Sequence, residues 1–196
     1  MTAALSDVPP SDDWVPPPGG WTTDDLDALP EDNVRRELLD GVLLVSPSPS
    51  SIHQVIAGRL MVTLEQTCPD HLFVSQANDV QITPRRQFIP DVLITTFEAA
   101  SRGGGKYAAA EVVLAVEIVS PTSQSMDRVL KPALYAKAGI PLYWVVEIED
   151  GLVVHTFELD REHKVYRLAG SFKDVIEVDQ PWRIEIPIDR LRPRNM

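Results

Sequence analysis

The chain has 196 residues, of which 44% are hydrophobic and 24% are charged, enough for one compact domain with its own core. Its formal net charge of −11 excludes broad electrostatic attraction to nucleic acid, so any nucleic-acid function has to depend on a local basic patch or on bound metal ions. Its single cysteine, Cys68, excludes an intramolecular disulfide, and no apolar run approaches the roughly 20 residues that span a bilayer. We therefore expect a cytoplasmic protein without a membrane segment.

The first part of the chain contains little that a core could bury. Residues 1–20 are rich in proline, aspartate, serine and glycine, which predicts a disordered tail, and we expect residues 21–196 to form a single domain. The stretch "TTDDLDALP" (22–30) predicts a short helix that is capped by one of its two threonines. Two strand-like runs in residues 34–47 are joined by Asp40-Gly41, the pair that a type I′ turn favours, and predict a hairpin.

The middle of the chain alternates between helical and strand patterns. Residues 51–68 carry apolar side chains at helical spacing, and Ser51 with Gln54 fits a capping box. Strands are predicted within residues 71–82 and 84–95. Three consecutive glycines predict that residues 99–109 form a loop.

The remaining segments complete an α/β pattern. Residues 111–120 are almost wholly apolar, as expected of a strand that is buried on both faces, and residues 121–140 predict a helix that ends at Gly139. Further strands are predicted in residues 141–149, 151–159, 163–170 and 175–179. The sequence therefore predicts an α/β domain with an antiparallel C-terminal strand extension.

Three polar residues are not explained by these patterns. Asp91 directly precedes an apolar strand, Glu117 lies near the end of the buried strand, and Lys131 follows on the next helix. If the two strands pair, both carboxylates share one edge of the sheet and the helix brings Lys131 beside them. Two close carboxylates repel each other, and a divalent cation such as Mg²⁺ or Mn²⁺ relieves that repulsion while activating water for phosphodiester hydrolysis.

Simpler interpretations remain for each of these residues. Asp91 after a proline can be a turn residue that accepts hydrogen bonds from the backbone. Glu117 and Lys131 can form a buried structural salt bridge, and Asp127 with Lys131 can form a surface ion pair at i, i+4.

The combined motifs resemble a known family. The stretches that carry the resemblance are "RRELLDGVLLVSPSPSSIHQ" (35–54), "IPDVLI" (89–94), "AVEIVSP" (115–121) and "DRVLKPALYAKAGIPLYWVV" (127–146). They are similar to a family of small bacterial restriction endonucleases in the PD-(D/E)xK nuclease superfamily, over roughly residues 30–148. The resemblance implies a restriction-endonuclease-like fold, with a central mixed sheet flanked by helices and a Mg²⁺ or Mn²⁺ site.

The resemblance also implies roles for individual residues. Pro90-Asp91 matches the "PD" and Glu117 the "(D/E)", but Val119 stands where the motif has its lysine. The family is similar in moving that lysine to the following helix, where Lys131 stands. The residues expected to support these three are Glu37, as a third metal-binding acid, with His53 and Tyr135 at the border of the site.

The predicted activity is a metal-dependent endonuclease that acts on nucleic acid, with DNA as the expected substrate. Pro132, directly after Lys131, predicts that the helix either begins near residues 128–131 or is kinked there. That proline and the acidic charge favour an alternative, a catalytically inactive nuclease fold that serves as a binding or dimerisation module. The exposed strand edges expected between residues 142 and 186 predict a homodimer.

Overall fold

The structure is a computed structural model that describes residues 15–30, 34–121, 123–149 and 151–194. Its helical segments are α1 (Thr23–Asp27), α2 (Ser51–Glu65), α3 (Phe97–Ser101), η2 (Ala109–Glu111), η3 (Met126–Leu130), α4 (Lys131–Ala138) and η4 (Ile188–Arg190). Its strands are β1 (Arg35–Leu39), β2 (Val42–Ser46), β3 (Leu72–Ser75), β4 (Asp79–Thr83), β5 (Arg86–Phe88), β6 (Val92–Thr96), β7 (Lys106–Ala108), β8 (Val112–Ile118), β9 (Leu142–Glu147), β10 (Val153–Asp160), β11 (Val165–Phe172), β12 (Val175–Val178) and β13 (Ile184–Pro187). Of the expected tail, residues 1–14 lie outside the described part of the chain.

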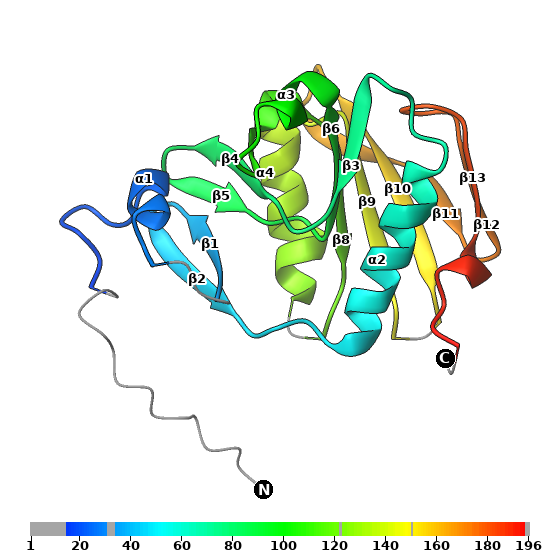
Figure 1. The fold of residues 1–196 in the computed structure, drawn as a ribbon, viewed down its shortest axis with the longest axis horizontal. Helices are drawn as coiled ribbons and strands as arrows, with labels where there is room; N and C mark the ends of the chain where they lie inside the picture. The colour runs from blue at the N-terminus through cyan, green and yellow to red at the C-terminus, as the bar shows by residue number, and fades with distance from the viewer. Residues whose placement is uncertain (1–14, 31–33, 122, 150, 195–196) are drawn as a thin grey trace, which may run out of the picture.

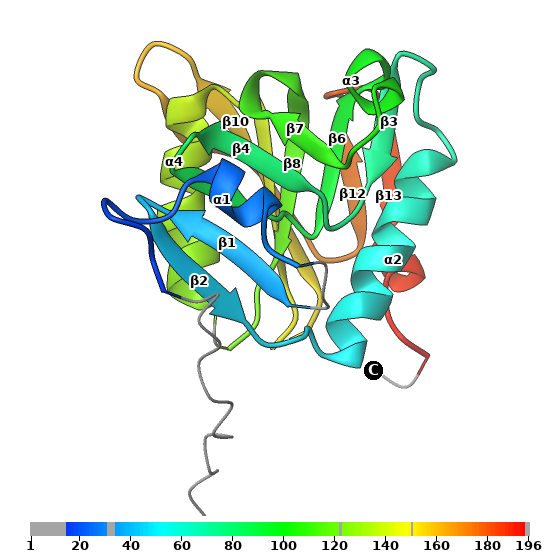
Figure 2. The same ribbon diagram turned by 60° about the vertical axis from the view of Figure 1, so that its left-hand side comes forward.

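The strands form two main sheets and one hairpin (Figure 1). The larger sheet has the order β11-β10-β9-β8-β6-β3, and the smaller one has the order β2-β1-β5-β4-β7. Figure 2 brings the smaller sheet forward, whereas α2 lies against the larger sheet, where it contacts β3 and β6. In the larger sheet β8 and β9 are parallel, whereas its other neighbouring strands are antiparallel. This arrangement confirms the predicted α/β fold with mixed sheets, flanking helices and an antiparallel C-terminal extension.

Alternation along the central strands separates two hydrophobic cores. On β8, Leu114, Val116 and Ile118 face a core that includes α2 and the β12–β13 hairpin. The intervening Ala115 belongs to a second core, on the opposite face, that includes α4 and the smaller sheet. Glu117 is two residues after Ala115, so its side chain lies on the same face of the sheet, the face that packs against α4.

Several local predictions are confirmed. Thr22 caps α1, and the β1–β2 hairpin turns at Asp40 (φ 52°) and Gly41 (φ 84°), both in the left-handed region that a type I′ turn requires. Gly139 ends α4 with a φ of 88°. No helix within the described residues combines the length and hydropathy needed to cross a membrane.

Two local predictions are wrong. The cap of α2 is Ser50 rather than Ser51, because the Ser50 hydroxyl accepts a hydrogen bond from His53 N at 3.3 Å. Residues 99–109 are not a loop throughout: α3 extends to Ser101, capped by Thr96, and β7 follows the three glycines. β7 is a strand because it pairs in parallel with β4, which lies far from it in the sequence, so the local pattern of residues does not indicate it.

Candidate active site

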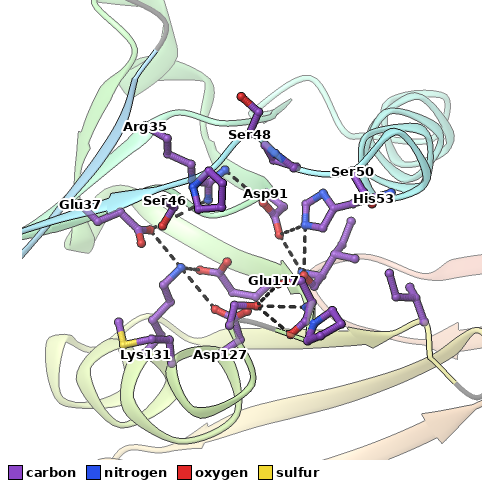
Figure 3. A pocket seen from close by; sticks show the side chains of 18 of the residues that line it. Arg35, Glu37, Ser46, Ser48, Ser50, His53, Asp91, Glu117, Asp127 and Lys131 are labelled. Atoms are coloured by element: carbon purple, nitrogen blue, oxygen red, sulfur yellow. Dashed lines mark hydrogen bonds and ion pairs between the residues drawn. The ribbon is translucent and has the colours of Figure 1, made fainter. Parts of the chain in front are cut away.

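A cavity of about 450 Å³ lies where the β1–β2 hairpin, the start of α2, the ends of β6 and β8, and η3–α4 meet. Its charged and histidine side chains are Arg35, Glu37, His53, Asp91, Glu117, Asp127 and Lys131, and Figure 3 shows them directed toward one another. All six of the residues predicted for the site are therefore close together, since Tyr135 contacts Glu117 behind the cavity.

Pairing of β6 with β8 places Asp91, directly before β6, beside the end of β8. Val92 pairs with Val116, the backbone N–H of Asp91 donates to Val116 O at 3.0 Å, and the backbone N–H of Ile118 donates to the Asp91 carboxylate. Asp91 and Glu117 line the same cavity from these two neighbouring strand ends. The expectation that the two strands pair and share an edge is confirmed.

The Asp91 carboxylate is buried and surrounded by hydrogen-bond donors. Its Oδ2 accepts from Ile118 N at 2.8 Å and contacts His53 Nε2 at 3.1 Å, while Arg35 Nη1 lies 3.3 Å from Oδ1. Burial by itself would raise the pKa of Asp91, but the hydrogen bond to His53 and the charges of His53 and Arg35 hold that pKa below its ordinary value. Asp91 is therefore an ionised carboxylate at neutral pH.

Glu117 has the opposite electrostatic setting. Only 1% of the residue is exposed, and its Oε1 accepts hydrogen bonds from Tyr135 Oη at 3.0 Å and Lys131 Nζ at 3.1 Å. Burial raises the pKa of Glu117 well above its ordinary value, and the nearby carboxylates of Asp91, Asp127 and Glu37 add to the rise while Lys131 opposes it.

Lys131 lies among three carboxylates. Its Nζ is 3.0 Å from Glu37 Oε1, 3.1 Å from Glu117 Oε1 and 3.4 Å from Asp127 Oδ1. Burial would lower the pKa of Lys131, but these three charges outweigh it and raise the pKa above its ordinary value. Lys131 is therefore a permanent cation and not a general base. The interpretation of Asp127–Lys131 as a surface ion pair is wrong, because both side chains are buried.

Two residues of the site were not predicted from the sequence. Asp127 completes the set of carboxylates around Lys131, and Arg35 contacts Asp91. A signal for Arg35 was present, because it is two residues before Glu37 on the same strand and therefore shares its face. Glu37 itself is fixed by the backbone, since its Oε1 accepts a hydrogen bond from Ile89 N at 2.9 Å.

His53 marks a point where two oxygen atoms converge. Its Nε2 is 3.1 Å from both Asp91 Oδ2 and the carbonyl oxygen of Ile118, while its Nδ1 is buried without a hydrogen-bond partner in the described part of the chain. A single Nε2–H serves both oxygens. A carboxylate and a backbone carbonyl are also the ligand types that hard divalent cations prefer.

The donor set fits Mg²⁺ or Mn²⁺ in type and charge. When all are ionised, the four carboxylates outnumber the two permanent cations by two negative charges. The atoms that could bind a metal ion here are carboxylate and carbonyl oxygens, which Mg²⁺ and Mn²⁺ prefer. Across the described residues, no three His, Cys, Asp or Glu side chains are already arranged around one metal position. Lys131 and His53 hold the oxygens instead, so metal binding would have to exchange those contacts.

Comparison with known proteins places this site within a family. Residues 23–186 match the family model Uma2, described as "Putative restriction endonuclease". The fold is similar to the crystal structure of a putative nuclease belonging to DUF820 from Anabaena variabilis, with a TM-score of 0.68 and 16% sequence identity over 87% of this chain and 96% of that chain. No curated protein matches the chain. Because the family model spans most of the chain and includes every residue of the predicted site, the protein belongs to the Uma2 family, and the resemblance expected from the sequence is confirmed.

Proposed function

We propose that this protein is a metal-dependent endonuclease that hydrolyses phosphodiester bonds in DNA. The observation that carries the proposal is the meeting of Asp91, Glu117, Glu37 and Lys131 in one cavity of a nuclease-family fold. The single cysteine and the expected DNA substrate suit a cytoplasmic site of action.

Each side chain has a role in this proposal. Asp91, Glu117 and Glu37 hold Mg²⁺ or Mn²⁺, which supplies activation of water and stabilisation of the leaving oxygen when bound. Lys131 stays protonated and neutralises negative charge that develops on the phosphoryl group. His53 orients the Asp91 carboxylate through Nε2, and Tyr135 orients the Glu117 carboxylate through its hydroxyl.

Arg35 supplies the second permanent cation at the cavity. Its side chain is 19% exposed, compared with 4% for Lys131, so it is the more accessible of the two to a substrate phosphate. Guanidinium groups bind phosphate oxygens in a bidentate manner, which suits binding of the substrate next to the cleaved bond.

One observation favours a second candidate, a nuclease fold without catalysis that serves as a binding or dimerisation module. The ammonium group of Lys131 already has three carboxylate partners, an arrangement that is also expected of a purely structural ion network. The net charge of −11 is in keeping with this alternative.

A cleavage assay separates the two candidates. Wild-type protein is incubated with supercoiled plasmid, single-stranded DNA and RNA, with and without Mg²⁺ or Mn²⁺. We expect metal-dependent cleavage of DNA that Asp91→Ala slows on the order of a hundredfold or more. Asp70→Ala, which removes an exposed acid, is the matched control and should cleave like the wild type. Cleavage that Asp91→Ala leaves unchanged would place the activity elsewhere.

We also propose that the protein forms a homodimer through β11. This strand is one edge of the larger sheet, and its Val165 and Leu168 are 47% and 61% exposed. An exposed hydrophobic edge strand favours pairing with another strand. Sedimentation at micromolar concentration should show a dimer for the wild type and a monomer for Leu168→Lys. A wild type that sediments only as a monomer would contradict the proposal.

A further inference from the structure

The helix that carries Lys131 contains a π-helical turn directly before that residue. Residues 126–130 form the turn, and the backbone N–H of Lys131 donates to Met126 O, five residues earlier, instead of to Asp127 O. An α-helix pairs each N–H with the carbonyl four residues earlier, and single π-turns inside α-helices are rare and frequent at functional sites. Here the turn holds both Asp127 and Lys131, whose side chains line the cavity.

Pro132 leaves the Asp127 carbonyl without a partner from the helix. Proline has no N–H to donate, and in a regular helix its ring would clash with the carbonyl of Arg128. Because Lys131 donates to Met126 instead, neither residue 131 nor residue 132 donates to Asp127 O. A buried carbonyl without a hydrogen bond is costly, so the π-turn needs a donor from elsewhere in the fold.

Tyr143 on β9 supplies that donor. Its hydroxyl donates to Asp127 O at 2.6 Å, and the whole residue is buried. The ring is fixed by its neighbours: its centroid is 5.4 Å from that of Tyr166 in a stacked arrangement and 5.8 Å from that of Tyr135. The position of the hydroxyl is therefore set by the core.

We propose that Tyr143 is a positioning residue, whose hydroxyl stabilises the π-turn that directs Lys131 and Asp127 into the cavity. The proposal rests on the proposed nuclease function for its catalytic consequence, but the position of Lys131 is measurable without activity. Without the hydroxyl, the helix relieves the unpaired carbonyl by changing its hydrogen-bond register, and the Lys131 side chain leaves its three carboxylates.

Tyr143→Phe tests this inference, and Tyr166→Phe is the matched control. Tyr166 is the stacked neighbour, and its hydroxyl also donates to a backbone carbonyl, that of Ile140, at 2.9 Å. Both substitutions remove one hydroxyl from the same aromatic cluster, but only the first touches the π-turn. Pro132→Ala is a second test, because it restores an N–H and allows regular α-helical pairing without opening the core.

The first readout is the side-chain ammonium resonance of Lys131 in protein labelled with ¹⁵N-lysine, assigned by its loss in Lys131→Met. We expect Tyr143→Phe and Pro132→Ala to shift or broaden this resonance while the protein stays folded, and Tyr166→Phe to leave it unchanged. A wild-type resonance in Tyr143→Phe overturns the proposal, whatever Pro132→Ala shows. An equal change in Tyr166→Phe also overturns it, because a general loosening of the core would then explain the result.

The second readout is kinetic. We expect Tyr143→Phe to lower kcat by between about tenfold and about a hundredfold with little change in KM, because Lys131 is misplaced in the transition state while substrate binding is retained. A lowered kcat with an unchanged Lys131 resonance contradicts the positioning role. If the wild type does not cleave nucleic acid, the proposed function fails, and the resonance still decides whether Tyr143 positions Lys131.

Discussion

Lys131→Met is expected to lower the free energy of unfolding by about 3 to 5 kcal/mol at neutral pH, the cost of removing one partner from a buried ion pair. Methionine keeps the length and packing of the side chain but removes the ammonium group. Glu37, Glu117 and Asp127 then lose the cation that lies within 3.0 to 3.4 Å of each of them. Denaturation with urea, followed by circular dichroism, measures the effect.

The loss should grow as the pH rises. The raised pKa of Lys131 means that its stabilising contribution is present throughout the range below its ordinary value of 10.5. The pKa values of Glu117 and Asp127 are raised by burial, so each destabilises the fold as the pH rises through its folded-state value. Without Lys131 that penalty is larger, and the difference between wild type and variant should widen from pH 5 to pH 8.

Lys106→Met is the matched control for this prediction. Lys106 Nζ lies 2.7 Å from Asp27 Oδ2, but the side chains are 23% and 53% exposed. Ion pairs at the surface contribute at most about 1 kcal/mol. If Lys131→Met costs no more than Lys106→Met, the three carboxylates do not depend on the Lys131 cation.

Glu117→Gln should separate stability from activity. Glutamine retains an oxygen that can accept from Tyr135 and Lys131, and Lys131 keeps the carboxylates of Glu37 and Asp127. We therefore expect the free energy of unfolding without metal to stay within about 1 kcal/mol of wild type, while DNA cleavage slows on the order of a hundredfold or more. The raised pKa of Glu117 makes the wild type lose stability as the pH rises through that value, and the glutamine variant lacks this loss.

A different outcome would support the structural alternative. If Glu117 served only as the partner of Lys131, its replacement would cost roughly 3 to 5 kcal/mol, as for other broken buried pairs. Tyr135→Phe is a useful comparison, because it removes the hydrogen bond that the neutral Tyr135 hydroxyl donates to Glu117 Oε1 and leaves the Glu117 carboxylate and Lys131 in place. A large loss for Glu117→Gln together with unchanged cleavage would remove Glu117 from the catalytic site.

The central pair of acids could be predicted from the sequence because Asp91 directly precedes an apolar strand and Glu117 lies within one. A carboxylate beside a buried strand demands a partner, and antiparallel pairing of neighbouring segments brings Asp91 and Glu117 together without further information. The hairpin was equally local, since Asp40-Gly41 specifies its own turn.

The remaining parts of the site depend on contacts between distant elements. Pro132 indicated an irregular helix, but the π-turn that places Asp127 beside Lys131 also involves Tyr143, on a later strand. Arg35 reaches Asp91 only because the smaller sheet packs against the end of the larger one. The three glycines after α3 led to the prediction of a loop, although Thr96 caps this helix: its Oγ1 accepts a hydrogen bond from Ala99 N at 3.3 Å.

Whether the cavity binds a divalent cation can be measured directly by calorimetric titration of Mn²⁺ into wild type and Glu117→Gln, with thermal melting of the same samples. We expect saturable binding to the wild type, a melting temperature that rises with metal concentration, and at least a tenfold or so weaker affinity in the variant. Wild-type protein that binds no metal at millimolar concentration, or a variant that binds it equally well, would contradict the assignment of Asp91, Glu117 and Glu37 as metal ligands.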